Sequence, residues 1–340
     1  MALIATGSKS NTTKFPMNIL VFGKDGQLGK AFRVLFDAAA LPDEVNIQYV
    51  GRTECDLSNG EALNALLAKE KPSLIINASA YTAVDKAETE IDMAYAINAR
   101  APEFMAQYAA QHGATFLHYS TDYVFDGSKD GWYVEDDVRN PLGVYGKSKA
   151  AGELAIEKTF ANSALGQFAI FRTSWVYGDG GNFIRTMLRL AKDREELKVI
   201  HDQHGVPTSA NWLAKVSLSL ALDEHFRIKK FASGIYHAVP AGETTWHGLA
   251  CLAIQTALDT GIKLKAKPGA IKPIPATEYP LPAPRPMNSR MDSAKLRHAL
   301  QGSLLEDSNS YNELQNMPNF PAWDGIVQEY VSKLAADGLI

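Results

Sequence analysis

The sequence predicts an α/β fold: a doubly wound, Rossmann-like parallel sheet with a smaller C-terminal lobe. From Met17 to about Val176, short apolar runs alternate with longer segments of helical periodicity, which is the pattern of successive βαβ units. The runs are continuously apolar and do not alternate with polar residues, which indicates strands covered on both faces. A glycine-rich turn follows the first run directly.

The expected elements can be placed by their periodicity and end signals. Strands are expected at residues 19–22, 47–50, 74–76, 115–119 and 168–172, and helices at residues 26–39, 59–69, 92–111 and 145–160. Asn59 is suited to cap the second helix and Gly113 to end the third. After Val176, helices are expected at residues 182–192, 211–225 and 245–260, and the proline-rich stretch 268–286 excludes a long helix.

The composition is typical of a soluble globular protein. Of the 340 residues, 46% are hydrophobic and 21% are charged, and the net charge is −4. Because no basic field is available for a phosphate backbone, nucleic acid is not an expected partner. No stretch approaches the roughly 18 uninterrupted apolar residues of a membrane span. Residues 1–16 lack the apolar core of a signal peptide, so we expect a flexible leader there and no membrane contact.

The cysteines and histidines argue against a metal site. Cys55 and Cys251 lie far apart and in no CxxC spacing, which excludes a zinc ribbon, disfavours a disulfide framework and favours a cytoplasmic location. None of the eight histidines has metal-ligand spacing, since His201 and His204 fall in an expected loop without a supporting acid. No protein-held metal is expected.

Gly23, Gly26 and Gly29 lie between the first strand and the first helix. Glycines allow the tight turn and the close approach of backbone amides to a pyrophosphate, and the helix N-terminus presents free N–H groups to that anion. Three glycines alone would also suit a turn without a ligand, but their position between strand and helix favours dinucleotide binding.

This interpretation divides the chain into two parts. Residues 17–180 are expected to form a dinucleotide-binding domain, with a segment near 207–240 returning to its sheet. Residues 181–206 and 241–340 are expected to form the substrate-binding lobe.

Arg52 follows the second strand, where cofactor specificity is commonly decided. A carboxylate at this point holds a ribose 2′-hydroxyl, whereas an arginine holds a 2′-phosphate. Arg52 therefore favours NADPH, although Glu54 and Asp56 are close by and keep NADH possible, and a solvated surface arginine is the alternative.

Tyr145 and Lys149 open the helix that follows the fourth strand. Their four-residue spacing places them on one helix face. An ammonium beside a phenol lowers the phenol's pKa, and such a pair can deliver a proton to a carbonyl oxygen. The fourth strand ends at Ser120 and Thr121, and a hydroxyl at this edge of the sheet can align the same carbonyl. Tyr-x-x-x-Lys by itself is common, but its order after this strand makes it specific.

With these residues identified, the chain resembles the extended short-chain dehydrogenase/reductase superfamily. Within it, the dTDP-4-dehydrorhamnose reductase family is the most similar, from Met17 to about Asp292. The motifs that carry the resemblance are Gly23-Lys-Asp-Gly-Gln-Leu-Gly29, Asn77-Ala-Ser-Ala-Tyr-Thr-Ala-Val-Asp-Lys-Ala-Glu88, Tyr119-Ser-Thr-Asp-Tyr-Val-Phe-Asp-Gly127, Val144-Tyr-Gly-Lys-Ser-Lys149, Phe171-Arg-Thr-Ser-Trp-Val-Tyr-Gly178, Asp202-Gln-His-Gly-Val-Pro-Thr208 and Arg285-Pro-Met-Asn-Ser289.

The resemblance implies an NAD(P)H-dependent reduction of the 4-keto group of dTDP-4-dehydro-L-rhamnose. It implies that Thr121, Tyr145 and Lys149 are catalytic, with Tyr145 as the proton donor. The cofactor would be lined by Gly23, Gly26, Gln27, Leu28, Gly29, Arg52, Asp56, Leu57, Ala78, Ala80, Tyr81, Tyr145 and Lys149. The substrate would be contacted by Thr121, Trp175, Asn182, Arg285 and Asn288.

Two of the substrate assignments have an independent physical basis and an open alternative. The indole face of Trp175 suits the apolar side of a deoxysugar, but it would equally suit a core or lobe-interface aromatic. Arg285 could pair with the substrate's pyrophosphate, or it could be a solvated arginine in a proline-rich loop.

Two other functions stay open at this point. One is a non-catalytic, NADP-binding regulatory subunit, against which the intact Thr121, Tyr145 and Lys149 argue. The other is a nucleotide-sugar epimerase or dehydratase of the same superfamily, because a dehydratase carries an acidic residue where Asp122 follows Thr121. The expected partner is a nucleotide-sugar substrate, and the protein is expected to be a monomer or a homodimer.

Overall fold

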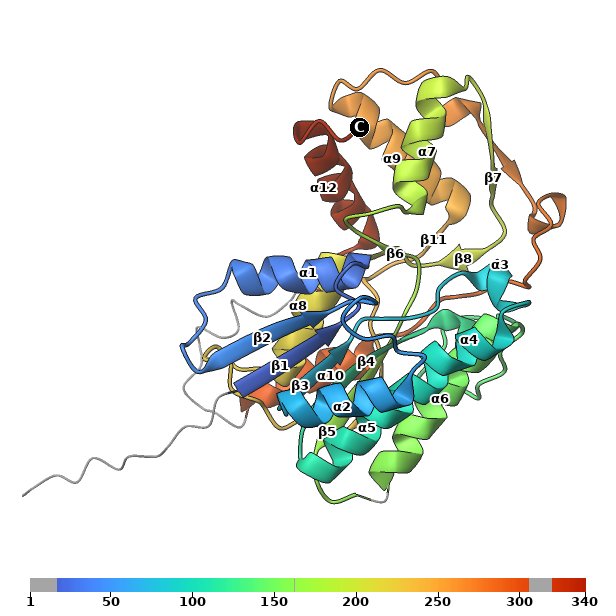
Figure 1. The fold of residues 1–340 in the computed structure, drawn as a ribbon. Coiled ribbons are helices and arrows are strands. Elements are labelled where there is room, and N and C mark those ends of the chain that lie inside the picture. Colours follow the sequence, from blue (N-terminus) through green and yellow to red (C-terminus); the bar gives the residue numbers. More distant parts are fainter. Residues whose placement is uncertain (1–16, 162, 306–319) are drawn as a thin grey trace, which may run out of the picture.

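A six-stranded parallel sheet forms the centre of the molecule (Figure 1). The computed structural model describes residues 17–161, 163–305 and 320–340, so the leader predicted at residues 1–16 lies outside the described residues. In the order β10-β5-β4-β3-β1-β2, the strands are β1 (Met17–Phe22), β2 (Val45–Val50), β3 (Leu74–Asn77), β4 (Thr115–Thr121), β5 (Gln167–Thr173) and β10 (Gly234–His237). The predicted fold class is confirmed, and each of the five predicted strands lies within one of these.

Helices cover both faces of the sheet. One face is covered by α1 (Gln27–Asp37), α8 (Ala210–Ala221) and α10 (Ala294–Leu305), and the other by α2 (Gly60–Glu70), α5 (Ala101–His112) and α6 (Val144–Ala161). Because successive strand residues point to opposite faces, Ile19 and Val21 pack with the first group, and Leu20 and Phe22 with the second. Burial on both sides explains why the strands are continuously apolar.

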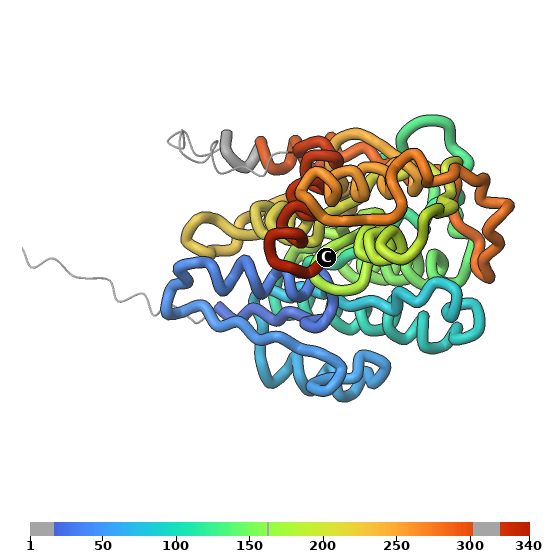
Figure 2. Tube along the Cα trace, turned by 90° about the horizontal axis from the view of Figure 1, so that it is seen from above, coloured from blue at the N-terminus to red at the C-terminus, as the bar shows by residue number. Residues whose placement is uncertain are grey.

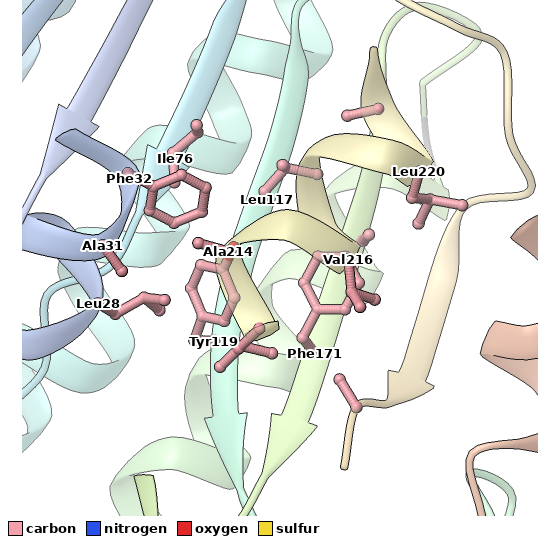
Figure 3. Packing of buried hydrophobic residues seen from close by; sticks show 14 of the residues in the cluster. Leu28, Ala31, Phe32, Ile76, Leu117, Tyr119, Phe171, Ala214, Val216 and Leu220 are labelled. Atoms are coloured by element: carbon pink, nitrogen blue, oxygen red, sulfur yellow. The ribbon is translucent and has the colours of Figure 1, made fainter. Parts of the chain in front are cut away.

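Figure 3 shows the first of these two cores at close range. Phe32 of α1 and Val216 of α8 are fully buried against the strands. The ring of Tyr119 lies 6.1 Å from that of Phe32 and stacks at 5.5 Å on that of Phe171. This packing holds β4 in place, and β4 ends at Thr121.

The helix ends follow local signals in the sequence. The Asn59 side chain accepts a hydrogen bond of 3.1 Å from the amide of Ala62 at the start of α2, and Gly113 ends α5 with a φ of +71°. Both ends agree with the prediction.

The helix predicted at residues 92–111 is interrupted. It consists of α4 (Ile91–Tyr95), a π-helical turn η1 (Ala96–Arg100) and α5. Within this turn, the Asn98 side chain accepts from the amide of Tyr81 and donates to the Tyr81 carbonyl and to Ser148 Oγ. Single π-helical turns inside α-helices are frequent at functional sites.

The lobe has a core of its own. Helices α7 (Phe183–Asp193), α9 (Trp246–Asp259) and α12 (Trp323–Ala336) pack around β7 (Leu197–Ile200) and β12 (Ile271–Ile274), which pair in parallel. Figure 1 shows these helices gathered on one side of the sheet domain, and Figure 2 looks down onto the molecule from that side. As predicted, the proline-rich stretch contains no long helix: it holds η3 (Pro268–Ala270), β12 and η4 (Ala276–Glu278).

Helix α10 is not part of this lobe. Its residues Leu296 and Leu300 are buried in the same core as α8, and the helix contacts β10. The predicted boundary, which placed all of residues 241–340 in the lobe, is wrong for this helix, because its apolar residues cover the edge of the sheet. The segment expected to return to the sheet supplies α8 and β10.

Short elements connect the two parts. The helices α3 (Val84–Ala87) and η2 (Asp122–Val124) follow β3 and β4, and β6 (Val176–Tyr177) pairs with β9 (Thr208–Ser209). In the lobe, β8 (His204–Gly205) pairs with β11 (Thr244–Thr245). None of the described helices is both long and apolar enough to cross a membrane.

Candidate active site

A cavity of about 750 Å³ lies at the carboxyl ends of the central strands. The chain passes from β1 to β2 on one side and to β3 on the other, and ligands of open α/β sheets bind at such a switch point. Of the predicted site residues, the cavity is lined by Gly23, Gly26, Gln27, Leu28, Arg52, Asp56, Leu57, Ala78, Ala80, Thr121, Tyr145, Lys149 and Trp175.

The glycine loop after β1 is shaped to hold an anion. Gly23 has a φ of +84°, and a Cβ atom there would lie 2.7 Å from the backbone of Ala78. Helix α1 begins next to the loop with no side-chain cap and no acidic residue in its first turn. Its free amide ends and positive dipole therefore suit a pyrophosphate.

Gly29 does not line the cavity. A Cβ atom at this position would lie 2.1 Å from the carbonyl oxygen of Gly23, so no other residue fits between helix and loop. Its role is the close packing of α1 against the loop, and its contribution to a cofactor site is indirect.

The charged side chains after β2 differ in whether they are free to bind a ligand. Glu54 accepts a hydrogen bond of 2.5 Å from Lys24 and one of 2.8 Å from the amide of Gly51, and these bonds lower the pKa of Glu54 to about 2. Asp56 is held by the amide and hydroxyl of Ser58. Arg52 is exposed, lines the cavity and forms no ion pair within the described part of the chain. The guanidinium is thus the group available to a ligand phosphate.

Tyr145, Thr121 and Asp122 form a polar cluster at the end of β4. Thr121 Oγ1 donates to Asp122 Oδ1 at 2.8 Å, and the Thr121 hydroxyl is close enough to the Tyr145 phenol to lower its pKa. Burial raises the pKa of Tyr145 to about 12, and the nearby Asp122 adds to this shift. The phenol is therefore protonated at neutral pH, as a proton donor must be.

Asp122 is itself enclosed. Ser289 Oγ, which comes from the distant loop after η4, donates to Asp122 Oδ2. Burial raises the pKa of Asp122 to about 6, against the lowering effect of the hydroxyls of Ser289 and Thr121. The strand-end cluster is thus closed by a residue 167 positions away in sequence.

Lys149 lines the cavity, but its amine points toward the sheet. Its side chain is only 1% exposed, and Nζ lies 2.5 Å from the Tyr119 carbonyl oxygen and 3.2 Å from His118 Nε2. Burial lowers the pKa of Lys149 to about 8. The expectation that Lys149 lowers the pKa of Tyr145 is wrong for this arrangement, because the amine is engaged by β4 and not by the phenol.

Trp175 reaches the cavity together with an aromatic residue that the sequence analysis missed. Trp175 has a φ of +49°, and its indole stacks at 3.7 Å on that of Trp246 at the start of α9. Trp246 also lines the cavity, and Phe183 packs against it at 4.7 Å. No local pattern marks Trp246, because only the folding of the lobe brings it to the site.

Tyr81 lies beside the cavity but does not line it. Its amide and carbonyl are bonded to Asn98, and its hydroxyl donates to Glu90 at 2.6 Å. Its neighbours Ser79 and Thr82, which were not predicted, do line the cavity.

The side chains of three residues predicted to contact the substrate form hydrogen bonds to other parts of the protein. Asn182 caps α7 and donates to the Gly178 carbonyl and to Tyr330. Asn288 donates from its buried amide to the carbonyls of Lys129 and Gly131, both at 2.7 Å. Neither lines the cavity. Both side chains organise loops, so the predicted direct contact is not the arrangement found.

Arg285 is the third, and its guanidinium is already paired. It donates to both carboxylate oxygens of Asp85, at 2.7 and 2.9 Å, and Asp85 also accepts from the amide of Ala283. The alternative of a solvated arginine is wrong, because the paired side chain is only 17% exposed, and the contact with a pyrophosphate stays a prediction. Glu88, in the same segment as Asp85, accepts from the amide of Val144 at the start of α6.

No group of three or more His, Cys, Asp or Glu side chains within the described ranges could hold a metal ion. The residues around this one cavity include a glycine loop suited to an anion, the exposed guanidinium of Arg52, the Thr121 hydroxyl, the Tyr145 phenol and Lys149. This set of groups fits a dinucleotide beside a carbonyl substrate.

The sequence matches the family described as RmlD substrate binding domain over residues 17–314. The dTDP-4-dehydrorhamnose reductase of Shigella flexneri is 44% identical over 289 residues, which cover 83% of this chain and 91% of that protein. The reductase of the same name from Burkholderia thailandensis is 41% identical over 292 residues, covering 83% and 92%.

Solved structures agree with the sequence match. A dTDP-4-dehydrorhamnose reductase from Clostridium acetobutylicum superposes with a TM-score of 0.76 at 33% identity, covering 94% of this chain and all of that one. The enzyme of that name from Bacillus anthracis, in complex with NADP, has a TM-score of 0.75 at 30% identity, covering 93% and 99%. On these matches, the chain belongs to the dTDP-4-dehydrorhamnose reductase family.

Proposed function

We propose that this chain reduces the 4-keto group of dTDP-4-dehydro-L-rhamnose to give dTDP-L-rhamnose, with NADPH as reductant and Tyr145 as proton donor. The observation that carries the proposal is that Thr121, Tyr145 and Lys149 line the same cavity as the glycine loop. Family membership supports the reaction, and the NADP bound to the Bacillus anthracis relative supports the cofactor.

The cofactor-binding role falls to the first part of the chain, residues 17–180. The loop at Gly23 and the start of α1 would hold the pyrophosphate, and Arg52 would hold the 2′-phosphate. Glu54 is engaged by Lys24 and Gly51 and does not line the cavity, whereas Arg52 does, which favours NADPH over NADH.

NADPH, when bound, supplies the hydride that reaches the keto carbon. The Tyr145 phenol, protonated at neutral pH, delivers the proton to the keto oxygen. The Thr121 hydroxyl, which donates to Asp122 in this structure, would turn its proton to the keto oxygen and so orient it. Lys149 returns the lost proton to Tyr145 or holds the cofactor ribose once its amine turns from β4 to the cavity.

The sugar would lie against the stacked indoles of Trp175 and Trp246, where α9 of the lobe meets the sheet domain. Indole faces suit the apolar side of a 6-deoxysugar. In this assignment the lobe contributes an aromatic surface to the site. Arg285 and Asn288 fix the loop after η4, which carries Ser289 to Asp122.

A spectrophotometric assay tests the proposal. The purified chain is mixed with NADPH and a panel of nucleotide-linked keto-sugars, and loss of the reduced-nicotinamide absorbance is followed. We expect stoichiometric oxidation with dTDP-4-dehydro-L-rhamnose and no need for a partner protein. Conversion of sugar without net oxidation would indicate an epimerase or dehydratase, and cofactor binding with neither outcome would indicate a regulatory subunit.

A further inference from the structure

A chain of buried polar groups leads from the loop after β3 to Lys149. Asn77 Oδ1 accepts from the amide of Ser79 at 3.2 Å and from its hydroxyl at 2.5 Å. Asn77 Nδ2 lies 3.1 Å from His118 Nδ1, and His118 Nε2 lies 3.2 Å from Lys149 Nζ. Asn77 and His118 are fully buried, so water cannot substitute for any of these partners.

The direction of each hydrogen bond in this chain can be deduced. A backbone N–H can only donate, so the oxygen of the Asn77 amide must face Ser79 and its NH₂ must face His118. His118 Nδ1 must then accept. Since burial lowers the pKa of His118 well below its usual value, the ring is neutral and its one proton is on Nε2.

An Nε2–H directed at Lys149 has a consequence for the lysine. An ammonium has three donors and no acceptor, whereas a neutral amine has a lone pair. Two donors cannot bond to each other, so the contact at 3.2 Å is favourable only when Lys149 is neutral. The Tyr119 carbonyl, at 2.5 Å, accepts one of the amine's own N–H groups.

The nearest carboxylate counteracts this preference only in part, since burial of Lys149 outweighs the effect of Glu153, which raises the pKa of the amine. The carboxylate nearest along α6 is Glu153, which is fully buried and accepts from Arg172 at 2.7 and 3.0 Å and from Arg139 at 2.6 Å. Two guanidiniums therefore neutralise it. The other titratable and charged groups on the elements packed around Lys149, within the described residues, include His118 and Tyr119 on β4, Tyr145 on α6, Asp122 in η2 and Arg172 on β5.

We propose that His118 is a positioning residue that holds Lys149 as a neutral amine against the Tyr119 carbonyl, by directing its Nε2–H at the amine's lone pair. Protonation of Lys149 places two donors face to face, so the ammonium leaves His118 and turns toward Tyr145 and the cavity. The inference rests on the proposed function of Lys149. It gives the amine two positions: against β4 when it is neutral, and toward the cavity when it is protonated.

The first experiment reads the tautomer directly and needs no activity. Long-range ¹H–¹⁵N correlation spectra of the ¹⁵N-histidine-labelled protein distinguish the two neutral tautomers, and the His118 signals are those lost in His118→Phe. We expect the Nε2–H form. An Nδ1–H form or an imidazolium at neutral pH would overturn the proposal, whatever the protein's catalytic activity.

The second experiment follows the proton affinity of Lys149 in labelled protein, with the signal assigned by its loss in Lys149→Met. His118→Phe keeps a ring of similar size and removes the N–H, so the proton affinity of Lys149 should rise by about tenfold or more, which corresponds to about one pKa unit. In His118→Gln, the amide oxygen of the glutamine can accept a hydrogen bond from the Lys149 ammonium. The proton affinity of Lys149 should therefore rise further in this variant. An unchanged titration midpoint in both variants contradicts the role assigned to His118.

Asn77→Asp provides a test that leaves both His118 and Lys149 in place. A carboxylate at position 77 can accept from Ser79 and from His118 Nδ1–H, which should move the ring proton to Nδ1 and leave Nε2 as an acceptor for an ammonium. We expect the tautomer to switch and the Lys149 midpoint to rise together. A raised midpoint without a change of tautomer would mean that the added charge acts alone, and would overturn the proposal.

Discussion

Asp85 in α3 and Arg285 in the loop after η4 are 200 residues apart in sequence and form a two-point ion pair, with N–O distances of 2.7 and 2.9 Å. The same loop continues to Ser289, whose hydroxyl donates to Asp122 beside Thr121. The pair therefore fastens the loop that closes the hydroxyl cluster of the active site.

Replacing Arg285 by lysine removes the two-point geometry and keeps the charge. Because Arg285 is mostly buried and Asp85 is partly exposed, we expect the free energy of unfolding to fall by about 1–2 kcal/mol. Urea unfolding measures this change. Asp85→Asn should have a similar effect, and the double variant should be less than additive. A rise in substrate KM confined to the Arg285 variant would instead indicate direct contact with the substrate.

Tyr145→Phe should lower kcat by roughly 10²–10⁴-fold, because it removes the general acid and leaves the cavity otherwise unchanged. NADPH affinity, measured by fluorescence titration, should be retained. Full activity in this variant would contradict the assignment of the proton donor.

The pH profile distinguishes Tyr145 from Lys149. With its pKa raised to about 12, Tyr145 stays protonated throughout the usable pH range and produces no alkaline limb. Lys149, with its pKa lowered to about 8, loses its proton within that range. A plot of kcat against pH should therefore show a break near pH 8 in the wild-type enzyme. The pH of this break should shift in His118→Phe. A break that does not respond to His118 would have to come from another group.

Arg52→Gln should change the choice of cofactor. Loss of a charged contact to the 2′-phosphate weakens NADPH binding on the order of 10- to 100-fold. The KM for NADH should change little, because NADH has no phosphate at this position. Equal effects on both cofactors would show that Arg52 does not contact the 2′-phosphate.

Lys149→Met should stabilise the fold while it impairs catalysis. Burial lowers the folded-state pKa from its ordinary 10.5 to about 8, so the unfolded chain binds a proton more tightly. Lys149 thus costs stability in full below pH 8, and the cost disappears as the pH rises to 10.5. The shift corresponds to about 3 kcal/mol at neutral pH.

Thermal unfolding of Lys149→Met and wild type at pH 7 and at pH 10 measures this difference. The increase in melting temperature of Lys149→Met over wild type should be larger at pH 7 than at pH 10. A variant that is less stable than wild type at neutral pH would mean that the amine's contacts with Tyr119 and His118 outweigh its desolvation.

The elements and the central chemistry were predictable because their signals are local. Strands buried on both faces are largely apolar, as in residues 74–76, and the approach of α1 to the loop admits only glycine at position 29. Tyr145 and Lys149 share a helix face by spacing alone. The order of these signals along the chain indicated a dinucleotide site next to a proton donor.

What the sequence could not show is which distant groups meet. Arg285 binds Asp85, Asn288 binds the loop at Gly131, and Trp246 reaches Trp175 only because the lobe folds back over the sheet. The same holds for the amine of Lys149, which contacts His118 and the Tyr119 carbonyl and not Tyr145 one turn away. Sequence alone determined the sheet and the glycine loop and indicated the proposed reacting groups, because each of these signals depends on neighbours a few residues away. Tertiary structure decided their partners and charge states, because hydrogen bonding and desolvation depend on segments that are close only in space.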